Sequence, residues 1–456
     1  MKKGFKISLL TVLTLVFVMG MALVGCSEDS SDPKTEDQPK ETDNTTTEVN
    51  EEPTTEQVLR VNFHSEPPTL DPGLASDSTS GTIIRAVFDG LTRLNPETNE
   101  YEPSAAEDVQ VSDDLLTYTF TIRDHSWTNG DPVTAHDFEY AWKRALDPAT
   151  AADYAYQLYY LKNGADANAG DVSLDEVGVR ALDDKTLEVT LENPTPYFLE
   201  LTAFYTYMPV NKSIVEANEN WANDATDLYA TNGPFKLTKW EHGSEVELVK
   251  NEDYWNVDAV KLQTINFSMV EDESTELAMY EAGDLDWAGA PFSSLPTDAM
   301  APLKESGDLI TQEIAGVYWY KFNTEIAPFD NEKMRKAFSY AINRQEIIDY
   351  VAQGNQKPAL GAVPLSMPLN PDGYFDPTVE EAQKLFDEAL AEMGLSSADE
   401  LPPIVLNFNT SEGHQKIAQA IQEQWNQAFG IQVTLENVEW GVYIDKLHEG
   451  DYQIGR

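Results

Sequence analysis

The alternation of apolar and polar residues predicts short β-strands interleaved with amphipathic helices. Runs that are rich in β-branched and aromatic residues predict strands. These strands are expected over residues 58–63, 115–123, 187–191, 246–250 and 318–322.

Apolar residues spaced three or four positions apart predict one helix over 332–351 and another over 411–429. Gly430 is expected to end the second helix, and a strand over 431–435 follows it. A third helix is expected to begin near Ala135, because Thr134 is a good N-cap residue after a turn. Interleaved helices and strands indicate an α/β fold, and we find no internal repeat.

The N-terminus has the three parts of a secretory signal peptide. Basic residues at positions 2, 3 and 6 precede an apolar run over 7–23, and Leu23-Val24-Gly25 then lead to Cys26. An uncleaved transmembrane anchor is the alternative, because a run of roughly 18 residues is just long enough to span a bilayer. Cys26 is the only cysteine and stands where a bacterial lipobox has its acylated thiol. We therefore expect a lipoprotein signal peptide over 1–25 and lipidation of Cys26.

Residues 26–57 have the composition of a flexible tether. Acidic residues greatly outnumber basic ones there, and no residue is aromatic. Such a segment cannot bury a hydrophobic core, and its like charges keep it extended.

Charge and cysteine use exclude several kinds of partner and chemistry. A net charge of −49 argues against nucleic acid and against electrostatic docking on anionic lipid. A single cysteine excludes an internal disulfide, and the six histidines have no metal-ligand spacing. The chain has no motif for nucleophilic catalysis, phosphate binding or dinucleotide binding. Its acid pairs are expected by chance among 79 acidic residues. We therefore expect neither catalysis nor a cofactor.

Tyrosine and tryptophan are concentrated in a few places, notably residues 154–160, 204–207 and 318–320. Most aromatic residues at this density belong to a hydrophobic core. Some also suit a hydrated binding cleft, because Tyr and Trp combine apolar faces with polar edges.

Eight segments, in order, resemble the oligopeptide-binding proteins that serve peptide ABC importers. The most specific is the stretch over 111–148, which contains DHSWTNGDPVTAHDFEYAWKRALDP. The other segments are EPPTLDP (66–72), FDGLTRL (88–94), TNGPFKLTKW (231–240), NEDYWN (251–256), MYEAGDLDWA (279–288), APFDNEKMRKAFSYAINRQEI (327–347) and FNTSEGHQKIAQAIQ (408–422). Together they span nearly everything from Val58 to the end.

The resemblance implies an α/β fold of the type II periplasmic binding proteins, in which a hinge joins lobes on either side of a cleft. Lobe I is expected over 58–89 plus 212–313, lobe II over 90–211, and lobe III from 314 to 456. The expected function is non-catalytic capture of short peptides at the cell surface or in the periplasm. A membrane permease and its ATPase subunits would then receive the peptide. Main-chain pairing and hydrated pockets would bind peptides without sequence specificity.

The resemblance also implies contacts with the peptide at particular positions. The main chain of Ser76, Asp77 and Ser78 corresponds to a peptide-pairing strand. Tyr154 corresponds to a tyrosine that faces the ligand, Trp319 falls where the family has an aromatic residue, and Trp440 corresponds to a tryptophan that lines a pocket. His414 and Arg456 correspond to residues that meet the carboxylates of longer and shorter peptides, and a guanidinium suits that partner through paired hydrogen bonds. An equally weighted alternative for His414 is a purely structural place in the first turn of a helix, beside Ser411.

Other functions are also possible interpretations of the sequence, some with the same fold and a different ligand. The same fold would also serve a peptide pheromone, a muropeptide, a sugar or a metal chelate. A tethered surface hydrolase would need an activated nucleophile or a metal site, which the sequence does not offer. A purely structural surface module is the third alternative.

The chain departs from the family pattern in two places. Near Ala352 it lacks a lysine that reads one peptide length. It also stops at GDYQIGR, which we interpret as the middle of a strand in a truncated lobe III, before the aspartate that grips the peptide's amino group.

We therefore expect residues 58–456 alone to bind peptides weakly, because a buried ammonium without its counter-charge is costly. Isothermal titration calorimetry with short peptides tests this expectation. A submillimolar dissociation constant would contradict it.

Overall fold

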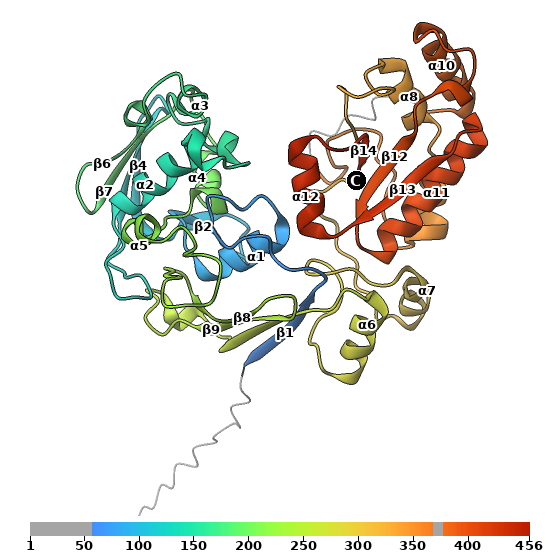
Figure 1. The fold of residues 1–456 in the computed structure, drawn as a ribbon. Helices are drawn as coiled ribbons and strands as arrows, with labels where there is room; N and C mark the ends of the chain where they lie inside the picture. The colour runs from blue at the N-terminus through green and yellow to red at the C-terminus, as the bar shows by residue number, and fades with distance from the viewer. Residues whose placement is uncertain (1–56, 368–376) are drawn as a thin grey trace, which may run out of the picture. The chain divides into compact units, whose positions relative to one another are not determined.

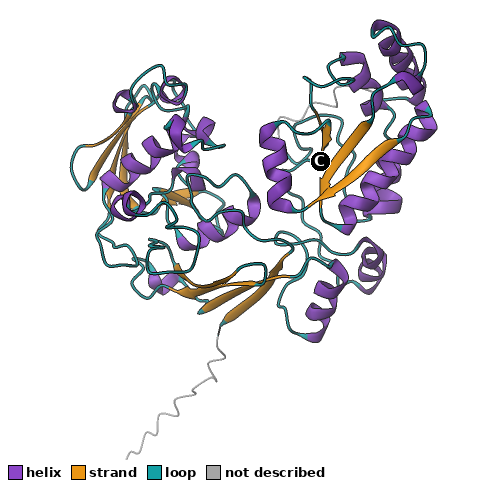
Figure 2. Ribbon diagram, in the orientation of Figure 1, coloured by secondary structure: helices purple, strands orange, loops and turns teal. Residues whose placement is uncertain are grey.

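The computed structural model describes residues 57–367 and 377–456. The predicted signal peptide, Cys26 and the predicted tether up to residue 56 lie outside these described residues. Within them the strands form three four-stranded sheets and one two-stranded ladder. Helices pack against the larger sheets (Figure 2).

The first sheet brings together segments that are far apart in the sequence. Its strands, in the order β1-β10-β9-β8, are β1 (Val58–Phe63), β10 (Thr264–Met269), β9 (Glu245–Lys250) and β8 (Phe235–Glu241). β1 pairs in parallel with β10, and the other two pairings are antiparallel. The rings of Phe63 and Phe267 stack at 4.6 Å on the buried face. The strands predicted over 58–63 and 246–250 are confirmed.

The second sheet is wholly antiparallel and is built from the chain between β1 and β8. Its order is β4-β5-β7-β6, with β4 (Ala106–Val111), β5 (Thr117–Ile122), β7 (Thr186–Thr190) and β6 (Val179–Ala181). A separate ladder pairs β2 (Thr92–Leu94) with β3 (Tyr101–Pro103). The strand predicted from residue 115 begins only at Thr117, because Leu115 has a positive φ of 58° in the preceding turn.

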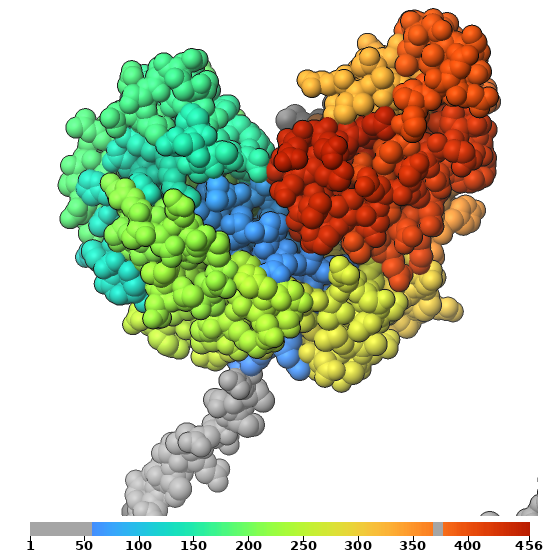
Figure 3. Space-filling model, in the orientation of Figure 1, coloured from blue at the N-terminus to red at the C-terminus, as the bar shows by residue number. Residues whose placement is uncertain are grey.

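The third sheet has the order β11-β14-β12-β13, with β11 (Lys321–Phe322), β14 (Ile454–Gly455), β12 (Ile404–Asn409) and β13 (Val433–Val438). β12 pairs in parallel with both β13 and β14. Helix α11 (Glu412–Phe429) joins β12 to β13, and α12 (Trp440–Glu449) joins β13 to β14. Because both crossovers are right-handed, the two helices lie on opposite faces of the sheet (Figure 1). The last helix, dark red in Figure 3, is exposed on the face shown.

The remaining helices follow the same order along the chain. They are α1 (Ser78–Val87), α2 (Ala135–Leu146), α3 (Gly164–Asn168), α4 (Phe198–Leu201), α5 (Lys212–Ala217), α6 (Glu273–Ala282), α7 (Thr297–Ser306), α8 (Glu332–Tyr340), α9 (Arg344–Ile347) and α10 (Val379–Glu392). Thr134 precedes α2 and donates its backbone N–H to Asp137 at 2.8 Å, as a capping box requires. Ser411 caps α11, and Gly430 ends it with a φ of 69°.

A continuous helix over 332–351 is wrong. Helix α8 ends at Tyr340, and Asn343 starts α9 by accepting a hydrogen bond from the Glu346 amide at 3.2 Å. The Arg344 side chain donates to the carbonyls of Ser339 and Ile342, so the end of α8 is satisfied without another helical turn. A π-helical turn over Ile348–Ala352 follows α9.

The strand predicted over 318–322 is also too long. Among the described residues only Lys321 and Phe322 pair, with Gly455 and Ile454 of β14. The aromatic residues before them lie outside the sheet.

Asp89 is the polar centre at which the chain passes between the first and second sheets. It is 5% exposed, and its carboxylate accepts from Trp255 Nε1 at 2.8 Å, from the Tyr254 hydroxyl at 3.0 Å and from the Ser104 hydroxyl. The side chain of Asn232 completes the junction by bonding both the amide and the carbonyl of Asp89. Through its carboxylate and its main chain, Asp89 thus joins three other segments of the chain, around residues 104, 232 and 254–255.

The substitution Asp89→Asn should lower the free energy of unfolding by about 2–3 kcal/mol, because buried donors lose a charged acceptor. Urea unfolding followed by circular dichroism measures the change. The matched control is Asp113→Asn at an exposed acid, which should stay within about 0.5 kcal/mol of the wild type. Equal effects of the two substitutions would contradict the role given to Asp89.

Candidate functional site

Ser76, Asp77 and Ser78, whose main chain is expected to pair with the peptide, form the loop at the start of α1, and Ser78 is the first residue of that helix. Asp77 is buried and caps this helix, accepting from the amides of Thr79 and Ser80 at 2.9 and 3.0 Å. Ser78 is exposed, and the Ser76 hydroxyl lies 3.5 Å from the Asp153 carboxylate. The loop is therefore held by its own helix cap.

Trp440 joins this loop to the third sheet. It is the first residue of α12, and its Nε1 donates to Asp77 at 3.4 Å. Its neighbours Glu439 and Gly441 line a cavity of about 640 Å³. The other lining residues are Glu66, Pro67, Pro68, Thr69, Ala222, Asn223, Asp224, Trp240 and His242. Trp440 itself is not among the residues that line this cavity.

Tyr154 belongs to an aromatic stack of the second sheet's helical cover. Its ring lies 6.0 Å from those of Phe204 and Tyr205 and 5.6 Å from that of Tyr156. Burial raises the pKa of Tyr154 above its ordinary value, so the hydroxyl is neutral at physiological pH. Trp319 is different, because it is 54% exposed.

His414 and Arg456 come together around Tyr318, which sequence reasoning noted only as part of an aromatic cluster. The Tyr318 hydroxyl lies 3.1 Å from Nδ1 of His414. The Arg456 guanidinium lies 5.2 Å from the centre of the Tyr318 ring and donates to Asn409 Oδ1 at 2.6 Å. Asn409 ends β12, so a cation and a histidine meet at the carboxyl end of that strand.

The environment keeps His414 uncharged. Burial, the positive charge of Arg456 and that of His64 lower the pKa of His414 to about 3. His414 also has the structural place in the first turn of a helix that was the alternative prediction. Its amide donates to the Ser411 hydroxyl at 3.3 Å in the first turn of α11. The backbone amide of His414 therefore has a structural role, while its ring contacts Tyr318.

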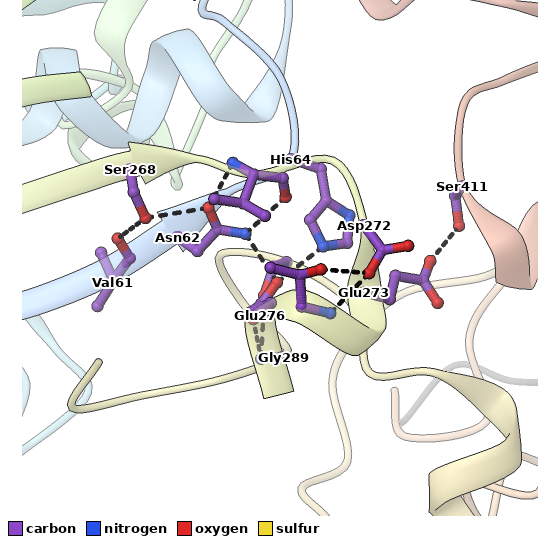
Figure 4. Close-up of polar contacts among 12 residues, drawn as sticks. Val61, Asn62, His64, Ser268, Asp272, Glu273, Glu276, Gly289 and Ser411 are labelled. Carbon is purple, nitrogen blue, oxygen red and sulfur yellow. Dashed lines mark hydrogen bonds and ion pairs between the residues drawn. The ribbon is translucent and has the colours of Figure 1, made fainter. Parts of the chain in front are cut away.

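Two buried carboxylates, Glu273 and Glu276, lie on α6 (Figure 4), and sequence reasoning missed both. Glu276 accepts from Asn62 Nδ2 and His64 Nε2, each at 2.8 Å, from the Gly289 amide at 2.9 Å and from the Ser293 hydroxyl. Burial raises its pKa, but these hydrogen bonds together hold the pKa below the ordinary value.

Glu273 has fewer partners. It is 0% exposed and accepts a hydrogen bond from the Ser411 hydroxyl at 2.7 Å. Its Oε2 atom has no hydrogen-bond partner among the described residues. Burial raises the pKa of Glu273, although the Ser411 hydroxyl, the charge of His64 and the Gly413 amide oppose that rise. No local sequence signal separates these two glutamates from the many exposed ones.

The described residues contain no cluster of three or more His, Cys, Asp or Glu side chains placed to hold a metal ion. In the ranges 57–367 and 377–456, the helices are also too short or too polar to cross a bilayer.

Comparison with known proteins identifies the class. The Borrelia burgdorferi periplasmic oligopeptide-binding protein OppAIV superposes with a TM-score of 0.82 at 33% identity, over 88% of this chain and 79% of that one. Haemophilus influenzae OppA, solved in complex with the peptide RPPGFSPFR, has a TM-score of 0.81 at 33% identity, with the same coverage. The fold is that of a type II periplasmic binding protein.

Sequence comparison then gives the family. The profile of "Bacterial extracellular solute-binding proteins, family 5 Middle" matches residues 100–456. The oligopeptide-binding protein OppA of Bacillus subtilis is 54% identical over 404 residues, which cover 88% of this chain and 74% of that protein. The chain belongs to the bacterial extracellular solute-binding proteins of family 5.

The folded pKa of His414 lies below the 6.5 of an ordinary histidine, so the unfolded chain binds its proton first. Stability should therefore fall as the pH drops below 6.5, by about 1–2 kcal/mol at pH 5 from this residue. Urea unfolding at pH 7 and pH 5 should show a smaller loss for His414→Gln than for the wild type. His136→Gln, at a histidine whose side chain is 54% exposed, should keep the wild-type pH dependence. Identical pH profiles for wild type and His414→Gln would refute the low pKa.

Proposed function

We propose that this protein captures short peptides outside the cytoplasm and delivers them to the permease and ATPase subunits of an ABC importer. The observation that carries this proposal is the 54% identity to a B. subtilis protein named for oligopeptide binding. Relatives of known structure include Listeria monocytogenes OppA bound to peptide, at 34% identity and a TM-score of 0.80.

The proposal assigns three lobes to the chain. Lobe I consists of 58–89 plus 212–313, lobe II of 90–211 and lobe III of 314–456. The grouping of the strands supports this division, because each of the three larger sheets draws all its strands from one of these sets. Lipidation of Cys26 anchors the protein to a membrane, with residues 26–57 as the tether.

The carboxylate end of the peptide is assigned to His414 and Arg456. Arg456 supplies a fixed positive charge and a guanidinium already oriented by Asn409. His414 is uncharged, so it contributes a ring N–H hydrogen bond and no ion pair. Tyr154, Trp319 and Trp440 supply aromatic surfaces, and Ser76, Asp77 and Ser78 supply main-chain groups.

A second cargo within the same family also has specific support. Escherichia coli relatives at 32% identity are named as a murein peptide-binding protein and a probable deoxycholate-binding protein. The ligand panel must therefore include a muropeptide and a bile acid beside ordinary peptides.

The test is the thermal shift of the protein expressed from its native gene without its first 25 residues. Peptides of two to six residues should raise the melting temperature in a length-dependent way, because a ligand that binds only the folded state stabilises it. Acetylating the peptide's amino group should abolish the shift.

Arg456→Gln should weaken binding of the shorter peptides by about tenfold, through loss of a charge-assisted pair. Lys304→Gln, at a lysine outside the proposed site, is the control. A shift with the muropeptide or bile acid alone would reject ordinary peptides as the cargo.

A further inference from the structure

Glu273 makes an unusual contact, because it caps a helix that it does not belong to. It is the first residue of α6, which follows β10 of the first sheet. Its carboxylate accepts from Ser411, the N-cap of α11, which follows β12 of the third sheet. Figure 4 shows the Glu273 carboxylate directed at the Ser411 hydroxyl. A negative charge at this end of α11 is also favoured by the helix dipole.

Ser411 relays this contact to the candidate site. Its hydroxyl donates to Glu273 at 2.7 Å and accepts from the amide of His414 at 3.3 Å. The hydroxyl proton is thereby directed at Glu273, which leaves a lone pair of the oxygen for the helix amide. One buried carboxylate therefore fixes both the rotation of the Ser411 hydroxyl and the position of the first turn of α11.

We infer that Glu273 is a positioning residue for ligand recognition: acting through Ser411, it holds the first turn of α11 so that the His414 ring meets Tyr318 and Arg456. The inference rests on the proposed function, because it takes the ligand to be a peptide. Glu273 is fully buried, so it does not touch the ligand. A purely stabilising role would not require an acceptor at this position, because an apolar side chain of similar volume would fill the space without burying a charge.

A second contact holds α11 against another helix, α7. Lys416 donates to the Thr297 hydroxyl at 2.8 Å and to Asp298 at 3.1 Å, both in the first turn of α7. This contact anchors the side of the helix one turn beyond Ser411. Loss of Glu273 should therefore loosen the first turn and leave the rest of α11 in place.

Several charged groups act on Glu273. His64 lies beside it on the segment after β1, Glu412 follows Ser411 on α11, and Glu276 lies one turn further along α6. His64 and the Ser411 hydroxyl favour the ionised form of Glu273, whereas burial and Glu412 oppose it. Glu273→Gln keeps the acceptor oxygen and removes the charge, so it separates hydrogen bonding from titration.

The experiment compares Glu273→Ala and Glu273→Gln with a control, Glu271→Ala, at an exposed acid two residues earlier. One readout is the affinity of the protein expressed from its native gene, without its first 25 residues, for its best-binding peptide. The other is the ring resonances of His414 in a histidine-labelled sample, assigned by their loss in His414→Ala. If Glu273→Ala is too unstable to purify, Glu273→Met replaces it, because Met fills the space without offering an oxygen acceptor.

Glu273→Ala should weaken peptide binding by about tenfold and shift the His414 resonances, because a hydrogen bond to a charged group is lost. Glu273→Gln should remain within about threefold of wild-type affinity at pH 7.5. In the His414→Ala background, Glu273→Ala should cost little further affinity, since both substitutions remove the same contribution.

A lower melting temperature with unchanged affinity and unchanged His414 resonances would overturn the inference, leaving a structural role only. Additive losses in the double variant would overturn it as well. If the wild type binds no peptide, the proposed function fails, and the His414 resonances alone decide whether Glu273 positions the ring. The two failures are therefore distinguishable.

Discussion

The hydrogen bonding of Asp89 is the constraint on which the rest of the architecture depends. The second sheet is an insertion into the chain of the first, so the polypeptide must leave β1 and return at β8. Both crossings meet at this buried carboxylate, which accepts from Ser104, Tyr254 and Trp255 while Asn232 bonds its main chain. A buried charge persists only where it is fully hydrogen-bonded, and these partners of Asp89 come from three separate segments, around residues 104, 232 and 254–255.

The same rule explains where the chain tolerates acid in its interior. A chain of net charge −49 keeps most of its carboxylates in water, where they cost little. Glu276 is buried with four donors, whereas one oxygen of the buried Glu273 carboxylate, Oε2, has no hydrogen-bond partner among the described residues. The poorly satisfied glutamate is the one that faces the helix carrying His414. Buried polar groups that are incompletely paired are more often found at functional sites than in structural cores.

Much of the secondary structure was predictable, because it depends on local periodicity. The helix over 411–429 and the strand over 58–63 follow directly from residue spacing and end residues. The prediction failed where a tertiary contact overrides that spacing. Asn343 and Arg344 break the apolar stripe of 332–351 through side-chain hydrogen bonds to the backbone.

By itself, the sequence determined the α/β class, the family resemblance and the motif around Cys26, because these are patterns of neighbouring residues. Only the tertiary structure decided which acids are buried and which side chains meet. His414 and Arg456 are far apart in the sequence, and no motif links them, yet both contact Tyr318. The pKa of His414 and the role of Glu273 follow from burial and from charges distant in sequence. Those properties arise from the packing of separate segments, which local residue patterns do not encode.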